Sequence, residues 1–226
     1  MNFTIVITTL LVILVSMTIH EAMHAFMGYA LGDNTAKEEG YFLGDQTAKA
    51  EGRLSLNPIR HIDPFLTILL PLVLLMLGAP VFGGAKPVPF NPHKVRFGEW
   101  GVALVAIVGP LTNLVLAFTF FGIGVSLGFV DKFGFSPSLI GVMLQTFVFV
   151  NLGFFAFNMI PIPPLDGSRV LYALAPDFVR GFMRQVEQYG LVIIMVLVMV
   201  GSPFISLFMN WLIVHTLQVF ILIFSV

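Results

Sequence analysis

The chain has 226 residues, of which 58% are hydrophobic and 10% are charged, and its mean hydropathy is +0.97. This composition excludes an ordinary soluble domain and predicts a polytopic membrane protein in a lipid bilayer. A formal net charge of −1 without a basic stripe gives no indication of nucleic-acid binding, and zero cysteines exclude disulfides and thiolate metal ligands.

Residues 3–30 are apolar and long enough to span the bilayer as one helix. The spacing of His20 and His24 places both imidazoles on one helix face, where their nitrogens can meet at a single ion, and Glu21 projects beside them. This is the H-E-x-x-H pattern, in which two histidines bind zinc and the glutamate serves as general base. A lone histidine in an apolar helix is usually a packed residue. Three ionisable groups within one turn at membrane depth indicate a functional site instead.

Residues 31–63 concentrate charge and contain an internal repeat. Residues 31–40 recur as residues 43–52, with eight of ten positions identical. Two copies are too few for a solenoid, so we expect either a tandem duplication tolerated in a surface loop or an extended flap beside the site. Alternating polarity predicts a short strand at residues 52–58, and the nearby His61 is either a further ligand or a solvated residue at the membrane edge.

Residues 64–82 are apolar but interrupted by prolines, and their borderline length favours a re-entrant or broken helix. A Gly/Pro-rich polar loop follows over residues 83–99. The next span, Trp100 to Val130, contains Gly109-Pro110, where a missing hydrogen bond and a missing side chain allow a neighbouring helix or a substrate to approach. Asn113 in the same span either bonds across helices or serves the site.

A short polar turn at residues 131–137 leads to a span at residues 138–160, and three prolines then exclude a regular helix over residues 158–169. Unwound backbone is tolerated at depth only inside protein or a water-filled cavity. By itself, Asp166-Gly167 is a turn signal. A zinc ion held by two histidines lacks a third protein ligand, however, and Asp166 is the best-placed carboxylate outside the first helix.

The membrane orientation follows from the shared ion. His24 and Asp166 must lie on the same side of the membrane to share an ion. If every apolar segment between them crossed the bilayer, they would lie on opposite sides. One segment therefore does not cross, and the proline-broken residues 64–82 are the best candidate. Ten of the eleven Lys and Arg residues then lie on the side of the metal and Lys132 on the other. This asymmetry predicts that the metal faces the cytoplasm.

The C-terminal part of the chain is mostly apolar. Residues 172–188 predict an amphipathic interfacial helix after Pro176. Residues 189–226 form one long span or a short hairpin, and His215 there is expected to pack or to bond a carbonyl. The whole chain therefore predicts one all-α domain, residues 1–226, with four to six transmembrane helices, a re-entrant segment and room for short strands at the membrane edge.

Three motifs in this order resemble those of the site-2 protease family, the zinc metalloproteases that cut transmembrane helices inside the bilayer. The motifs are His20-Glu21-x-x-His24, Gly109-Pro110-x-x-Asn113 and Asn158-x-x-Pro161-x-Pro163-x-x-Asp166-Gly167. The chain is most similar to the compact prokaryotic branch without a PDZ domain, and it departs from the family in the repeat, where one copy is expected. The resemblance implies zinc bound by His20, His24 and Asp166, water activated by Glu21, and Asn113 and Asn158 near the substrate carbonyl.

The expected function is zinc-dependent endopeptidase cleavage in or near a transmembrane helix of another membrane protein. The resemblance further implies regulated intramembrane proteolysis in a prokaryotic plasma membrane. One alternative is a metal transporter, which requires further ligands along a path in both leaflets. The other is a non-catalytic homologue, which would lose the glutamate, whereas Glu21 is present.

Overall fold

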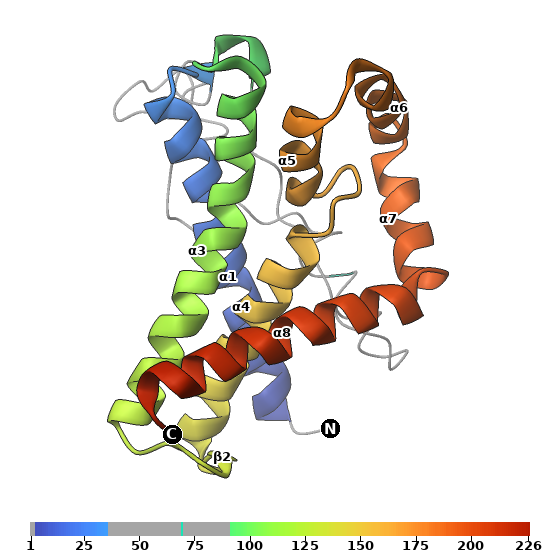
Figure 1. Ribbon diagram of the computed structural model, residues 1–226. Coiled ribbons are helices and arrows are strands. Elements are labelled where there is room, and N and C mark those ends of the chain that lie inside the picture. Colours follow the sequence, from blue (N-terminus) through green and yellow to red (C-terminus); the bar gives the residue numbers. More distant parts are fainter. Residues whose placement is uncertain (1–2, 36–68, 70–90) are drawn as a thin grey trace. The chain divides into compact units, whose positions relative to one another are not determined.

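The computed structural model describes residues 3–35, 69 and 91–226, and these ranges are predominantly helical (Figure 1). Four helical segments are long and apolar enough to cross a membrane: Ile5–Ala30, Gly98–Ser126, Leu139–Asn158 and Pro203–Phe224. The predicted all-α polytopic membrane protein is confirmed. Two expected features, the strand at residues 52–58 and the re-entrant segment at residues 64–82 apart from Leu69, lie outside the described residues. The chain divides into two compact units, Met1–Gly109 and Pro110–Val226.

Helix α1 (Phe3–Ala30) forms the long apolar element of the first unit. The segment contains no proline, and its first glycine is Gly28, so nothing interrupts the hydrogen-bond ladder. The helix ends where Gly32 adopts a φ of +101°, a conformation that costs a glycine little. There the N–H of Asp33 donates to the carbonyl of Gly28 at 2.9 Å, and the N–H of Gly32 donates to the carbonyl of Tyr29 at 3.0 Å. This Schellman arrangement satisfies two of the last helical carbonyls.

The end of α1 is fastened to the segment that precedes helix α3 (Gly98–Ser126). The buried carboxylate of Asp33 accepts hydrogen bonds from the N–H of Asn91 at 2.8 Å and from the N–H of Thr35 at 3.0 Å. The N–H of Arg96 donates to the carbonyl of Leu31 at 2.8 Å. A short 3-10 helix, η4 (Pro92–Lys94), lies between these two ties. Within the first unit, α3 therefore starts beside the end of α1, and its part up to Gly109 runs antiparallel to α1.

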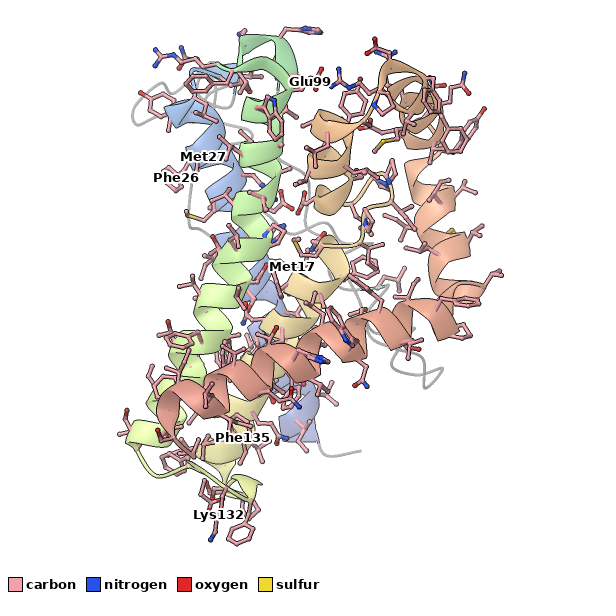
Figure 2. The ribbon with its side chains drawn as sticks, in the orientation of Figure 1. Met17, Phe26, Met27, Glu99, Lys132 and Phe135 are labelled. Atoms are coloured by element: carbon pink, nitrogen blue, oxygen red, sulfur yellow. The ribbon has the colours of Figure 1, made fainter. Side chains whose placement is uncertain are left out.

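The second unit opens with the rest of α3, followed by a small hairpin and helix α4 (Leu139–Asn158). The hairpin pairs β1 (Val130–Asp131) with β2 (Gly134–Phe135), and Lys132 lies at its tip (Figure 2). The sequence predicted only a turn here, because strands of two residues are too short to produce an alternating pattern. Ser138 caps α4 by accepting a hydrogen bond from the N–H of Gly141 at 3.2 Å.

The core of this second unit lies between α3, α4 and helix α8 (Ser202–Phe224). Its buried members come from all three helices and from the hairpin: Ala117, Phe121, Val130, Val148, Leu152 and Phe220. Phenylalanine rings dominate the contact, with Phe121 and Phe220 at a centroid distance of 5.7 Å. Aromatic packing of this kind holds helices together where lipid removes the hydrophobic drive for helices to associate.

Three shorter helices connect α4 to α8: α5 (Asp166–Leu174), α6 (Asp177–Glu187) and α7 (Gly190–Met199). Helix α6 has its charged residues Asp177, Arg180, Arg184 and Glu187 on one side, and Phe178, Phe182 and Met183 on the other. The amphipathic helix predicted after Pro176 is therefore present, and its place at the membrane interface stays a prediction. Residues 189–226 form two packed helices separated by a break at residues 200–201 (Figure 1). At 1.5 Å per residue α7 is only about 15 Å long, roughly half the hydrocarbon thickness, so α8 alone of this pair is long enough to span.

Candidate metal centre

The histidine pair lies in the C-terminal half of α1, within the apolar span Ile5–Ala30. His20 is buried, and its Nε2 atom is 3.0 Å from the Nε2 atom of His24. The two rings meet edge to face, with centroids 4.6 Å apart and planes at 84°. The predicted convergence of the two imidazoles on one face is therefore present, and the converging atoms are the same nitrogen of each ring.

This nitrogen pair fits a zinc ion. Two nitrogen ligands at 2.0–2.1 Å from a tetrahedral zinc ion lie about 3.3 Å apart, close to the observed Nε2–Nε2 distance. Neutral imidazole is also the ligand that zinc takes most readily in a chain without cysteine. The distance and the donor chemistry thus both suit the metal.

Helix α3 orients one of the two ligands. The Nδ1 atom of His24 is 2.7 Å from the carbonyl oxygen of Val105. A carbonyl oxygen only accepts, so Nδ1 carries the proton and donates it, and Nε2 presents its lone pair. Metal-binding histidines are commonly fixed through their second nitrogen in this way. The sequence did not predict Val105 as the partner of His24, because every residue has a backbone carbonyl and its residue type gives no indication of this bond.

Glu21 follows His20 directly, about 100° further round the helix. Its side chain is half-buried. Among the described residues it has neither a hydrogen-bond nor an ion-pair partner. The carboxylate is thus beside the histidine pair and is not engaged by another described side chain.

Asp166 belongs to the second unit, where it is the first residue of α5. The chain leaves helical geometry after Asn158, as the prolines predicted, but it returns to a helix at Asp166. The expectation that irregular backbone continues through residues 166–169 is therefore wrong. Gly167 allows the first turn of α5 to lie close to the end of α4, because a Cβ there would lie 2.6 Å from the carbonyl oxygen of Met159. A carboxylate in the first turn also interacts favourably with the helix dipole.

The membrane-depth asparagines of the second unit form hydrogen bonds within that unit. The side-chain amide of Asn113 donates to Oδ1 of Asn151 at 2.9 Å, and both residues are fully buried. Asn151 in turn donates to the carbonyl of Phe147 at 2.9 Å. Asn113 therefore bonds across helices, one of its two expected roles, and Asn151 is a partner that the sequence did not identify. Asn158 donates to the carbonyl of Phe154, one turn back in α4.

The buried amide pair leads to a prediction about stability. Replacing Asn113 or Asn151 by alanine should lower the thermal midpoint of the protein, because the remaining amide loses a buried partner. A double-mutant cycle of the two changes should give a coupling energy of about 0.6–1.7 kcal/mol, the range found between membrane helices. Additive effects would show that the hydrogen bond between the two amides contributes nothing to stability. Thr119→Ala, an exposed change on α3, is the control.

Other histidines take ordinary positions or lie outside the described residues. Nδ1 of His215 is 2.7 Å from the carbonyl of Trp211, which confirms the expected bond to a carbonyl. His93 is exposed in η4. His61, Asp63 and the second copy of the repeat lie outside the described residues, and of the first copy only residues 31–35 are described.

Comparison with known proteins gives consistent matches. The family model described as "Peptidase family M50" matches residues 136–201. The chain is 39% identical over 188 residues to YwhC of Bacillus subtilis, a protein named as a candidate zinc metalloprotease, and the match covers 82% of this chain and 77% of YwhC. It is 28% identical over 185 residues to Rip2 of Mycolicibacterium smegmatis, a protein named in the same terms, with 81% and 63% covered. No solved structure matches the chain. The zinc expected from the sequence agrees with the names of both relatives.

Proposed function

Because the chain belongs to the site-2 protease family, peptidase family M50, we propose that it is a zinc metalloprotease that cleaves a peptide bond in or beside a transmembrane helix of another membrane protein. The observation that carries this proposal is the convergence of two Nε2 atoms, 3.0 Å apart, within a helix that is apolar and long enough to span the bilayer. A metal centre at that depth reaches peptide bonds that soluble proteases do not.

The chain's own residues divide the work as follows. His20 and His24 would hold zinc through Nε2, and Asp166 would supply the third protein ligand. Bound there, zinc would supply Lewis acidity toward the scissile carbonyl and the attacking water. Glu21 accepts the proton of the attacking water and passes it to the nitrogen of the leaving amine. The family resemblance would place Asn158 near the substrate carbonyl, whereas the amide of Asn113 is fully buried and already bonded to Asn151.

The substrate segment must be extended at the moment of cleavage, because a helical peptide bond is shielded by its own hydrogen bonds. Strand addition to non-helical backbone is a common way of holding an extended peptide. In the second unit, the chain is non-helical between Asn158 and Asp166. This stretch, or the expected strand near Leu54, is the proposed partner for the unwound substrate.

Metal transport receives no support from the described spans. A transport path needs further ligands along its length. Within the described spans α3, α4 and α8, the ionisable residues are Glu99 in the first turn of α3 and the exposed His215. These two residues do not form the series of ligands that a transport path needs.

Metal dependence tests the proposed function. Purified protein in lipid nanodiscs should contain one zinc ion per chain and should cleave a model single-span substrate. A chelator should abolish cleavage, and added zinc should restore it. Cleavage that survives complete removal of zinc, or a protein that purifies without zinc and binds none, contradicts the proposal.

The proposed orientation places the metal side of the protein in the cytoplasm of a prokaryotic cell. Helix α4 separates Lys132 at the hairpin from the exposed Arg184 in α6. The chain has no cysteine, so Lys132→Cys and Arg184→Cys can be made directly in the natural sequence. In intact cells a membrane-impermeant maleimide should label Lys132→Cys, and it should label Arg184→Cys only after lysis. The reverse pattern contradicts the orientation, and labelling of both in intact cells contradicts α4 as a span.

A further inference from the structure

Two positions of α3 face the imidazoles of α1 within the first unit. They are Val105, whose carbonyl accepts the hydrogen bond from His24, and Gly109, one turn further along the same ridge. A Cβ atom at Gly109 would lie 2.4 Å from Nε2 of His24 and 2.7 Å from Cε1 of His20. The two imidazole rings therefore occupy the space that a side chain at residue 109 would fill.

The contact involves the metal-binding nitrogen itself, and this distinguishes Gly109 from other tightly packed glycines of α3, such as Gly122. At Gly122 a Cβ atom would lie 2.6 Å from Cζ of Phe224, at the far end of a phenylalanine ring. At Gly153 of α4 nothing lies within 4 Å. The three positions thus present a clash with zinc ligands, a clash with a packing side chain, and no clash.

The two imidazole rings cannot move away from an added side chain at residue 109 without breaking other contacts. Nδ1 of His24 is held by Val105, and its ring edge meets the ring of His20. A Cβ at Gly109 would be about 1.0 Å closer to Nε2 than the 3.4 Å at which ordinary contacts begin. Zinc–ligand distances in a working site stay within about 0.2 Å of their ideal values. Moving Nε2 far enough to admit one methyl group therefore exceeds the tolerance of the site.

We propose that Gly109 is a positioning residue for the zinc ligands, and that its bare backbone and the carbonyl of Val105 together set where Nε2 of His20 and His24 point. This inference rests on the proposed function, because it assigns a role toward the zinc held there. It also explains why a glycine occurs at the centre of a long helix, where it is less favourable than alanine by about 0.5–1 kcal/mol.

Zinc titration and cobalt substitution of three purified variants test this role. Gly109→Ala should weaken zinc binding by about 10–100-fold, the usual effect of disturbing the groups that orient a ligand. Its cobalt-loaded form should show a shifted ligand-field absorption spectrum. Gly122→Ala and Gly153→Ala should keep the zinc affinity and cobalt spectrum of the natural protein, although Gly122→Ala disturbs packing on the same helix. Natural affinity and an unchanged spectrum in Gly109→Ala would overturn the inference.

A further background covers the case in which Gly109→Ala does not fold. If the added methyl group destabilises the protein by striking His24 and His20, then replacing both histidines, with His20→Ala and His24→Ala, should remove the clash. In that background Gly109→Ala should leave the thermal midpoint almost unchanged, and a large further drop would overturn the inference. A natural protein that binds no zinc contradicts the proposed function, while this stability comparison still tests the contact at Gly109.

Discussion

Replacing Glu21 by glutamine is expected to reduce kcat by about 10²–10⁴-fold, the usual contribution of a general base, and to leave the zinc content unchanged. Glutamine keeps the size of the side chain and an oxygen that accepts hydrogen bonds, but it cannot take a proton from water at neutral pH. Because Glu21 has no hydrogen-bond or ion-pair partner among the described residues, the substitution breaks no described interaction. The expected loss therefore falls on catalysis and not on folding.

The measurement is single-turnover cleavage of a single-span substrate, together with zinc content and thermal midpoint for each variant. Glu99→Gln is the matched control, because Glu99 is exposed in the first turn of α3 (Figure 2). It should retain full activity. If Glu21→Gln cleaves at more than about a tenth of the natural rate, the general base is another group. If it loses its zinc, Glu21 supports the metal and its role in proton transfer is not established.

The sequence predicted the features that depend on side-chain type and spacing. Residues 3–30 have the length and apolarity of a spanning helix, and the structure has α1 at Phe3–Ala30. The spacing of His20 and His24 alone predicted two imidazoles on one face. The apolar residues 138–160 likewise predicted α4, because a helix satisfies its backbone groups internally and no other open segment can do so in lipid.

Features that depend on backbone or on pairing between distant segments left no such pattern. Nothing in the sequence predicted that the carbonyl of Val105 would accept a hydrogen bond from His24, although Gly109, one turn further along α3, indicated that a neighbouring helix or a substrate approaches closely there. In the sequence Asn151 resembles any other polar residue of a span, and its bond to Asn113 is visible only in the structure. The sequence also did not predict the start of α5 at Asp166, because a proline indicates where a helix ends more clearly than where the next helix begins.

Loss of the Asp166 carboxylate has the largest expected effect on the metal. Asp166→Ala should weaken zinc binding by more than the 10–100-fold typical of changes around the ligands, and it should abolish cleavage, because two histidines alone leave zinc under-coordinated. Asp166→Asn should retain more zinc but little activity, since a neutral amide oxygen is a poorer ligand. Equilibrium dialysis against a zinc buffer measures both affinities, and X-ray absorption reports how many imidazoles and oxygens surround the metal.

Asp177→Ala provides a closely matched control. Asp166 and Asp177 each open a helix and each place a carboxylate in its first turn, so both changes lose the same kind of interaction with the helix dipole. The side chain of Asp177 is fully exposed. Only the Asp166 variants should lose zinc. Equal zinc affinity in the Asp166 and Asp177 variants, or a third protein ligand such as His61 or Asp63, would leave Asp166 as the first residue of α5 and nothing more.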